Sequence, residues 1–557
     1  MKEYLQEISH ALSVKNLTKD DVTRLKVKLC KKHAQIDVPS DIKILTMLPV
    51  KEARRYQKIL RTKPVRSSSG VSVVAVMTKP QSCPHGKCAY CPGGPKSYFG
   101  SVPQSYTGKE PATRRAIRNN YDPYLQMFNR LEQYVVSGHV PEKIEVIIMG
   151  GTFPSYERKY QEEFVTMLFM AMNEFSEMFF RPDLDLMKFK EFFLLPGELE
   201  DNKREKELHR KITLLKRKST LEKEQKRNES SRARCVGLTI ETRPDYANLP
   251  HANEMLKLGC TRVELGVQAV DDELLQRVDR GHGVKEIAEA TKTLKELGFK
   301  INYHVMLGLP GSNLVRDLLN FEKLFSDARF RPDMLKIYPC MVMRGTKLEK
   351  LWKNGKYFPI TTEEAASCIV KVKQMVPPYV RIMRVQRDIP TNMTLAGVDR
   401  TNLRQYVSAL LKEKGLECRC IRCREIKKDV SREKILEKTI TYTASGGTEY
   451  FISLEQEDRI IGFCRMRFPE GSLRREIGKK SALIRELHVY GESTELGQKG
   501  TVQHRGFGKR LLSMAEKIAI KNNKRRIVVI SGVGVRDYYR KLGYHKEGPY
   551  MVKVLGK

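Results

Sequence analysis

The sequence predicts an α/β protein, with a large barrel or sheet and a smaller α/β unit behind a basic helical N-terminal region. Three observations support this fold class. Short β-rich runs alternate with longer helical patterns from Val71 to about Arg384, and a second strand-rich pattern begins at about Lys438. Residues 1–70 carry helical patterns that are rich in lysine and arginine. Repeated strand–helix alternation is typical of a parallel sheet or barrel covered by helices.

Length and charge limit the class of protein. The chain has 557 residues, with 102 lysines and arginines against 66 acidic residues, a net charge of +36, and 40% hydrophobic residues. A folded protein with this excess of positive charge is expected to bind a polyanion, first of all nucleic acid. No run reaches the roughly 18–20 apolar residues of a membrane span, and no signal-peptide core is present, so we expect a cytoplasmic protein without membrane contact.

The N-terminal region, residues 1–70, holds 16 lysines and arginines against 7 acidic residues. This imbalance favours a nucleic-acid-binding surface over the alternative, an ordinary solvated helix face.

Residues 71–395 are predicted to form a domain with its active site at the C-terminal ends of parallel strands. The predicted strands are VSVVAVM, KIEVIIMG, RCVGLTIE, RVELGVQ, KINYHVMLGLPG, MLKIYPCMV and YVRIMRV. Residues 183–234 are rich in lysine and glutamate, and we expect an exposed helical or mobile insertion there rather than core.

Three cysteines follow the first predicted strand. Cys83, Cys88 and Cys91 have the spacing C-x4-C-x2-C, and clustered thiols in a long chain without a signal peptide indicate metal ligands. Three thiolates can bind three irons of a [4Fe–4S] cluster and leave the fourth iron for a small chelating ligand. The alternative is a structural zinc ion, for which His85 is the local candidate as fourth ligand.

Two further segments accompany the cysteines. Gly151 and Thr152 end the strand KIEVIIM, and Glu264 and Gln268 are polar residues in the strand RVELGVQ. This combination resembles the radical S-adenosylmethionine enzymes, although most of that superfamily has one residue fewer in the first cysteine interval. The resemblance implies a [4Fe–4S] cluster that binds and cleaves S-adenosylmethionine. It places these four residues in the S-adenosylmethionine pocket, with strand packing as the alternative for each.

The C-terminal pattern begins with the runs TEYFISLEQ, DRIIGFCRMRF and SALIRELHV. The sequence Gln503-x-x-Gly506-x-Gly508 then opens an amphipathic helix, and a glycine turn at a helix N-terminus suits a pyrophosphate. With the strand RRIVVISGV and the run YYRKLGY behind it, this pattern resembles the GCN5-related N-acetyltransferase family.

The second resemblance implies an acetyl-CoA site. A strand beside the thioester, the helix start and two tyrosines would form it, and the tyrosines would protonate or orient the leaving thiol, with at least one of them a core aromatic. The implied residues are Glu486, Leu487, His488 and Val489 in the strand, Gln503, Gly506, Phe507, Gly508 and Lys509 at the helix, and Tyr538 and Tyr539.

Both resemblances occur together in one known family. The strings CPHGKCAYCPGGP, QSYTGKEP, MGGTFPS, VQRDIP, RELHVYG, QHRGFGKRLL and SGVGVRDYYRKLGY are similar to the catalytic subunits of the Elongator complex. The resemblance implies a radical S-adenosylmethionine partial (β/α) barrel at 71–395, a Cys-rich linker at 396–437 and an acetyltransferase domain at 438–557. It also assigns Lys143 to acetyl-CoA handling and catalysis, although a lysine at such a position is usually solvated.

For that family the implied reaction occurs on tRNA. The methyl carbon of acetyl-CoA joins C5 of the wobble uridine in the anticodon, and thioester hydrolysis leaves a carboxymethyl group. Elongator-type partner subunits and a homodimer are left open. Two alternatives are a protein lysine acetyltransferase with a structural iron–sulfur domain and a non-catalytic tRNA-binding scaffold.

The tRNA would be held by residues 1–70 and by a basic helical segment. Arg114, Arg115 and Arg118 alternate there with Tyr121 and Tyr124, so that cations could meet phosphates and rings could stack on bases. The alternative is an amphipathic helix with a charged outer face.

A second thiol group lies in the linker. Cys418, Cys420 and Cys423 offer three ligands within six residues, and the expected occupant is a structural Zn²⁺ that holds the two α/β units together. The spacing does not identify a fourth ligand.

Overall fold

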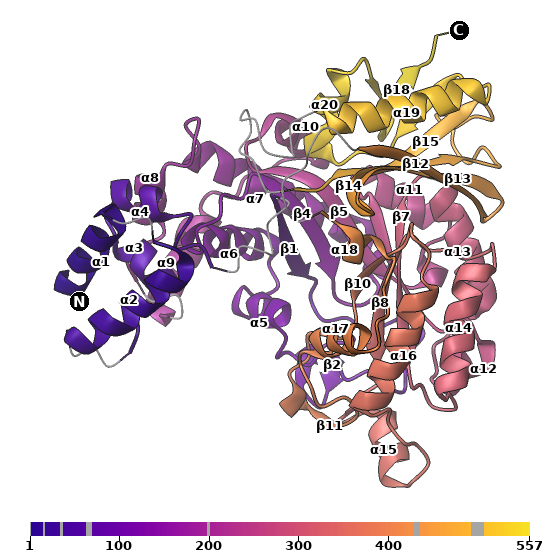
Figure 1. Cartoon of the computed structure of the whole chain (residues 1–557), viewed down its shortest axis with the longest axis horizontal. Helices are drawn as coiled ribbons and strands as arrows, with labels where there is room; N and C mark the ends of the chain where they lie inside the picture. Colours follow the sequence, from indigo (N-terminus) through magenta and orange to yellow (C-terminus); the bar gives the residue numbers. More distant parts are fainter. Residues whose placement is uncertain are drawn as a thin grey trace.

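The computed structural model describes residues 2–14, 17–33, 37–62, 70–197, 201–426, 435–491 and 506–556. Gln503, predicted at the pyrophosphate turn, lies outside the described residues. A helical N-terminal unit, a parallel sheet covered by helices and a C-terminal sheet follow one another along the chain (Figure 1). None of the described helices has the length and apolar character to cross a membrane.

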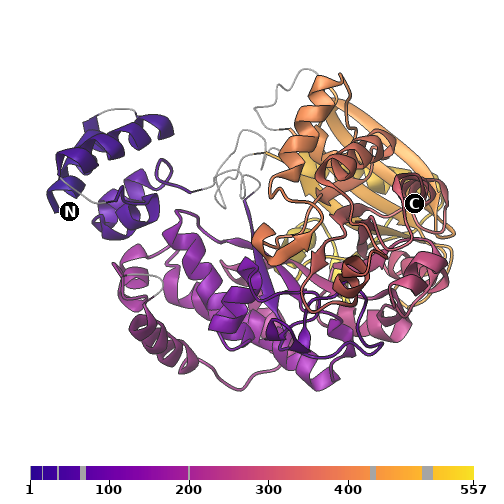
Figure 2. The same cartoon turned by 90° about the horizontal axis from the view of Figure 1, so that it is seen from below.

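The N-terminal unit has its own apolar core, in which Tyr4, Ile8, Leu29 and Tyr56 are buried. Figures 1 and 2 show that it stands at the side of the molecule. Its helices are α1 (Lys2–Val14), α2 (Lys19–Lys32), α3 (Asp41–Met47) and α4 (Val50–Tyr56).

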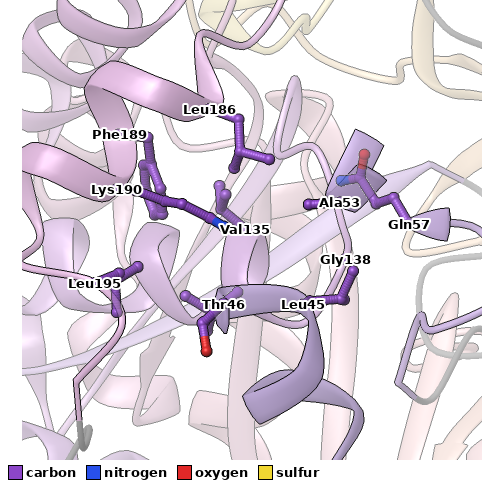
Figure 3. Close-up of a pocket in the computed structure, with 11 residues that line it drawn as sticks. Leu45, Thr46, Ala53, Gln57, Val135, Gly138, Leu186, Phe189, Lys190 and Leu195 are labelled. Carbon is purple, nitrogen blue, oxygen red and sulfur yellow. The ribbon is translucent and has the colours of Figure 1, made fainter. Parts of the chain in front are cut away.

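This unit docks on two helices of the barrel, α6 (Pro123–Val136) and α8 (Leu186–Phe192). A small pocket between them is lined mainly by apolar side chains, among them Leu45, Ala53, Val135 and Phe189 (Figure 3). Beside it Lys190 Nζ donates to the Leu48 carbonyl oxygen at 2.7 Å.

Seven parallel strands form the central sheet, in the order β1-β4-β5-β6-β7-β8-β10. Strands β1 and β10 are its edges, so the barrel is partial. Every strand lies on a run that the sequence predicts. The strands are β1 (Val71–Met77), β4 (Lys143–Met149), β5 (Arg234–Thr242), β6 (Arg262–Gln268), β7 (Lys300–Leu307), β8 (Met334–Pro339) and β10 (Arg381–Arg384).

Helices connect these strands and cover one face of the sheet (Figure 1). Odd-numbered residues of β7, such as Tyr303, point to this helical layer, where the Tyr303 and Thr291 hydroxyls are hydrogen-bonded. Because strand side chains alternate, the even-numbered residues of β7 face the opposite, concave side, here called the lumen. The main covering helices are α6, α7 (Arg158–Phe179), α11 (Leu249–Lys257), α13 (Val284–Glu296), α14 (Leu314–Ser326) and α16 (Thr362–Met375).

The C-terminal sheet has the order β12-β13-β14-β15-β16-β18-β17, and only the β15–β16 pair is parallel. The sequence analysis missed β12. This edge strand is largely exposed, although Ile440, Tyr442 and Ala444 alternate with threonines along it. The elements are β12 (Leu436–Ala444), β13 (Gly447–Gln456), β14 (Arg459–Phe468), β15 (Ser481–Val489), α19 (Phe507–Lys521), β16 (Arg526–Val529), α20 (Arg536–Arg540), β17 (His545–Glu547) and β18 (Tyr550–Val554).

The charged stretch 183–234 is helical, as predicted, but it is not wholly exposed. It forms α8, α9 (Asn202–Thr213) and α10 (Leu221–Ser230). Arg204 of α9 is buried and pairs with Glu132, and Glu229 of α10 accepts hydrogen bonds from Arg536 and Arg540 of the C-terminal unit. Some of its charged side chains therefore form ion pairs inside the protein, and the composition of the stretch does not predict these pairs.

The predicted tRNA-binding segment is also corrected in part. Arg115 donates to the Ala75 carbonyl oxygen at 3.0 Å and Arg118 pairs with Glu205 at 2.9 Å. Tyr124 is 0% exposed and belongs to the barrel core. Arg114 is exposed.

Buried charges join the C-terminal sheet to the barrel. Asp333, directly before β8, accepts from both terminal nitrogens of Arg485 at 2.7–2.9 Å. Arg465 Nη1 lies 3.6 Å and Lys295 Nζ 3.9 Å from Asp333 Oδ1. All four side chains are 0–1% exposed.

Neighbouring pairs extend this contact. Arg467 of β14 pairs with Glu449 at 2.9 Å and with Glu296 at the end of α13. Lys295 lies 3.5 Å from Glu449. We call Asp333, Arg485, Arg465, Lys295, Glu449, Arg467 and Glu296 the interface network. It fixes the C-terminal sheet at the end of the barrel where β8 begins.

Replacing Asp333 with alanine should lower the free energy of unfolding by about 3–5 kcal/mol, because three buried cations would lose a shared carboxylate. Denaturant titration followed by circular dichroism measures this loss. Glu470→Gln is the matched control, since it breaks an exposed pair with Lys292 across the same interface, and we expect a much smaller loss. Equal losses in the two variants would contradict a central role for Asp333.

The same carboxylate gives a pH prediction. Burial would raise the pKa of Asp333, but Arg485, Lys295 and Arg465 outweigh burial and hold the pKa at about 2, below the ordinary 3.8. Its stabilisation is thus present above about pH 4 and is lost as the pH falls toward 2. Stability curves of the parent and Asp333→Ala proteins should converge over this interval, and a constant separation would contradict the assignment.

Candidate active site

The loop after β1 gathers three cysteines at the C-terminal edge of the sheet. Cys88 and Cys91 are buried, and Cys83 is half-buried. The Ser105 N–H donates to Cys91 Sγ at 3.3 Å, and Arg280 Nη1 donates to Cys88 Sγ at 3.5 Å. Donors to sulfur stabilise the thiolate that binds a metal, whereas burial acts against it and raises the pKa of the Cys83 thiol and, to about 11, that of Cys91.

Their separation distinguishes a cluster from a single ion. With Zn–S bonds of about 2.3 Å, the sulfurs of a tetrahedral site lie about 3.8 Å apart. In the described part of the chain two groups of metal-ligating side chains have their ligand atoms within 4.8 Å of one another, and the three cysteines of this loop are not one of them. Their spacing fits a multi-iron cluster better than zinc with His85, whose Nε2 lies 3.2 Å from Cys88 Sγ.

Predicted S-adenosylmethionine residues lie at the same edge. Gly151 has φ +105°, and a Cβ there would lie 3.8 Å from Cys83 Sγ, so glycine keeps space open before the cysteines. Thr152 Oγ1 is 3.8 Å from Cys83 Sγ. Gln268 ends β6 with φ +69°. Glu264 lies four residues deeper, inside the barrel.

Glu264 belongs to a group of charged side chains in the lumen. Lys336 of β8 reaches across β7 to pair with Glu264 of β6, and lies 3.5 Å from Glu241 of β5. His304 Nε2 is 2.8 Å from Glu264 Oε2. Side chains of strands that are not neighbours, such as β8 and β6, can meet in this way only on the concave face of a curved sheet. We call Glu241, Glu264, His304 and Lys336 the lumen network.

The lumen network has an internal balance of charge. Burial would raise the pKa of Glu264, but Lys336, His304 and Arg262 hold it well below its usual range. Burial lowers the pKa of His304, and the charge of Lys336 lowers it further, against the opposing effect of Glu264. The pair is therefore a carboxylate and a neutral imidazole at neutral pH.

The sequence analysis missed His304, Lys336 and Glu241. Each is a polar residue within an otherwise apolar predicted strand, which is the signal that singled out Glu264. Tyr106 OH donates to Glu241 at 3.1 Å and connects this network to the loop that follows the cysteines.

The predicted acetyl-CoA strand lies at the opposite end of the lumen. Strand β15 pairs with β14 up to Val489, but with β16 only over residues 481–484. The edge that carries Glu486, Leu487 and His488 therefore separates from β16, and unpaired backbone groups there can bind an extended ligand.

The start of α19 forms the other side of this site. Gly506 has φ +87° and no side chain caps the helix, which leaves the N–H groups of Phe507, Gly508 and Lys509 for an anion. A Cβ at Gly508 would lie 3.0 Å from the Tyr538 hydroxyl, so Tyr538 faces this helix start. Tyr539 is 5% exposed and packs in the core of the C-terminal unit.

Charged side chains link this strand to the barrel. Lys300, the first residue of β7, lies 4.0 Å from Glu486 Oε1, and Arg465 donates to Glu486 Oε2 at 2.9 Å. Burial lowers the pKa of His488 to about 4. Lys143 begins β4, and burial lowers its pKa. It lies two residues before Glu145, which pairs with Arg262, so Lys143 shares the lumen face at the end nearest the C-terminal sheet.

The linker thiols form a separate group. The sulfurs of Cys418, Cys420 and Cys423 lie within 4.8 Å of one another, which suits a single tetrahedral ion. Lys373 Nζ is 3.3 Å from Cys423 Sγ. Within the described residues no fourth Cys, His, Asp or Glu belongs to this group.

Four family models match consecutive parts of the chain. They are the ELP3 N-terminal domain at residues 1–68, the Radical SAM superfamily at 78–321, the Radical_SAM C-terminal domain at 332–413 and the Acetyltransferase (GNAT) family at 420–544. The tRNA uridine(34) acetyltransferase of Methanocaldococcus infernus is 44% identical over 97% of this chain and 96% of its own length. This chain belongs to the Elongator complex protein 3 family.

Other members of this family are also close. Elongator complex protein 3 of Homo sapiens is 38% identical over 96% of this chain and 93% of its own length. A solved structure of the archaeal Methanocaldococcus infernus Elp3 with N-terminal residues 1–46 deleted has 40% identity and a TM-score of 0.71, and covers 87% of this chain and 100% of that chain. These findings confirm the predicted fold class, a radical S-adenosylmethionine partial barrel with an acetyltransferase domain and a helical N-terminal region.

The two thiol groups should bind different metals independently. After anaerobic reconstitution we expect about four irons and one zinc per chain, since three-cysteine loops hold [4Fe–4S] clusters and tight thiol groups hold zinc. Elemental analysis should find that Cys88→Ala loses iron and keeps zinc, whereas Cys420→Ser loses zinc and keeps iron. Iron retained without Cys88, or full zinc without Cys420, would contradict the corresponding site.

Proposed function

We propose that this protein is a tRNA-modifying enzyme that carboxymethylates C5 of the wobble uridine, with acetyl-CoA as carbon donor and S-adenosylmethionine as radical source. One observation carries the proposal. The cysteine loop and the acyl-CoA-type strand edge lie at the two ends of one barrel, and polar side chains fill the lumen between them. Two independent enzymes in one chain would not need this arrangement.

The names of the relatives support the substrate. Proteins named tRNA uridine(34) acetyltransferase are 43–44% identical over almost the whole chain. The net charge of +36 agrees with a polyanionic substrate.

The residues that would hold each cofactor follow from their positions. Cys83, Cys88 and Cys91 would bind the [4Fe–4S] cluster, and Gly151, Thr152 and Gln268 would bound the S-adenosylmethionine site. When bound, the cluster would supply the electron that cleaves S-adenosylmethionine to an adenosyl radical.

At the other end of the lumen, backbone groups of β15 would bind the pantetheine arm and the start of α19 the pyrophosphate. Tyr538 would orient or protonate the leaving thiol, and Lys143 would lie near the acyl end. A structural zinc on Cys418, Cys420 and Cys423 would fix the linker against the barrel.

The deciding experiment follows carbon from acetyl-CoA into tRNA. Reconstituted protein is incubated anaerobically with tRNA, S-adenosylmethionine, a reductant and isotope-labelled acetyl-CoA, and nucleosides are analysed by mass spectrometry. We expect label in 5-carboxymethyluridine and none with Cys88→Ala. Acetylation of a lysine peptide without S-adenosylmethionine, unchanged in Cys88→Ala and with unlabelled uridine, would replace the proposal with a protein acetyltransferase.

The N-terminal unit is proposed to bind tRNA phosphates. Lys28, Lys31 and Lys51 are exposed on its helices, and Lys58 is exposed in the turn after α4. The double variant Lys51→Glu, Lys58→Glu should weaken tRNA binding and lower the slope of log Kd against log salt by about one per lost phosphate contact.

Fluorescence anisotropy at several salt concentrations measures this slope. Lys285→Glu, an exposed charge reversal on α13 of the barrel, is the control and should change the slope less. A salt-independent Kd of the parent protein would overturn the phosphate-binding role.

A further inference from the structure

The lumen network contains an arrangement that the cofactor sites do not explain. His304 is held by a buried carboxylate, and its side chain is 15% exposed, whereas that of Glu264 is 0% exposed. The imidazole thus lies between a fixed partner and the open side of the lumen. A polar group in this position can act on a bound molecule.

The hydrogen bond to Glu264 selects the useful tautomer. A carboxylate only accepts, so His304 Nε2 carries the proton in their 2.8 Å contact. The lone pair is then on Nδ1, away from Glu264. A neutral imidazole whose other nitrogen donates to a carboxylate is the recurring arrangement of a general base.

Burial and the charge of Lys336 keep His304 neutral. Glu264, Glu241 and Lys336 face it, and the Tyr338 ring packs edge-on at 5.5 Å. Burial lowers the pKa of the imidazole and the Lys336 charge adds to this effect, despite the two carboxylates. Lys336 also supplies the cation between Glu241 and Glu264.

The position agrees with a role on the acyl group. At about 3.3 Å per residue, His304 lies about 13 Å along β7 from Lys300, the residue that meets Glu486 of the acyl-CoA strand. On the other side, Glu264 lies two residues before Gly266, whose carbonyl oxygen accepts from Arg280, the donor to Cys88. If the acetyl methyl carbon is to react near the cysteine end, its thioester carbonyl must enter this part of the lumen.

The other lumen-facing imidazole is a weaker candidate. His488 is half-buried, its Nε2 has no hydrogen-bond partner in the described structure, and no carboxylate among the described residues fixes its tautomer by a hydrogen bond. His304 has the orienting partner that His488 lacks.

We propose that His304 is the general base that activates water for hydrolysis of the acyl thioester, with Glu264 as its positioning residue. This inference rests on the proposed function, in which hydrolysis converts the thioester to the carboxymethyl group. Water oxygen forms the new bond to the acyl carbon, and His304 Nδ1 accepts its proton. The carbon–sulfur bond then breaks, and the imidazolium returns the proton to the departing thiolate, which Tyr538 orients. The products are a thiol and a carboxylic acid, which ionises in solution.

The test separates hydrolysis from the radical chemistry. His304→Gln keeps a donor for Glu264 but removes the base, and His545→Gln, an exposed residue of β17, is the matched control. The parent and variant proteins are compared for thiol release from acetyl-CoA with tRNA and for 5′-deoxyadenosine formation from S-adenosylmethionine. We expect His304→Gln to lower thiol release about 100-fold or more, with 5′-deoxyadenosine within about threefold of the parent value.

A second pair of variants distinguishes catalysis from structure. Added imidazole should restore thiol release in His304→Gly but not in His304→Gln, because only the glycine variant leaves room for it. Glu264→Gln should lower thiol release by at least about tenfold. Iron content and circular dichroism check that each variant folds.

Two results would overturn the inference. Thiol release by His304→Gln within threefold of the parent rate would do so, as would failure of imidazole to rescue folded His304→Gly. Neither result depends on label in uridine. If the parent enzyme labels uridine and His304→Gln releases thiol at the parent rate, only the role of His304 as general base is refuted. A parent enzyme that releases thiol through His304 without labelling uridine refutes only the proposed function.

Discussion

Asp333 and the cations around it are the contact on which the rest of the molecule depends. One carboxylate at the start of β8 meets two arginines of the C-terminal sheet and a lysine of the barrel. Together with Glu449, Glu296 and Glu486, four carboxylates face the four cations Arg465, Arg467, Arg485 and Lys295. Buried charges are costly unless all are paired, so this contact tolerates little displacement. Its specificity, more than any net gain in stability, aligns strand β15 with the barrel.

The lumen of the barrel that this contact aligns with the C-terminal sheet is polar. Parallel sheets are buried on both faces and are usually apolar, yet β5, β6, β7 and β8 direct Glu241, Glu264, His304 and Lys336 inward. These charges are satisfied by one another, which makes the polar interior tolerable. The same pairing leaves one imidazole with a fixed tautomer. A polar lumen between the cysteine loop and strand β15 agrees with the proposed reaction, which joins a fragment of acetyl-CoA to a uridine.

The two cysteine groups illustrate what spacing can and cannot predict. The C-x4-C-x2-C pattern is compatible with iron–sulfur or zinc, and the match to the Radical SAM superfamily favours the cluster. The linker thiols lie within single-ion distance, and the nearby Lys373 comes from a helix about fifty residues earlier in the chain. Similarly, the sequence predicts that Arg115 and Tyr124 belong to a nucleic-acid-binding surface. In the structure Arg115 donates to a backbone carbonyl oxygen and Tyr124 is buried.

The sequence by itself determined the seven parallel strands, the order of the units and the two local groups of cysteines, because these depend on periodicity and on residues close together in the chain. It also determined the positive charge. Only the tertiary structure decided which polar residues share the lumen, that Tyr538 and not Tyr539 faces the start of α19, and that the charged stretch 183–234 packs against the barrel and the C-terminal sheet. The physical reason is that strand curvature and long-range ion pairs bring together residues 40 to 300 positions apart. No local pattern encodes such distances.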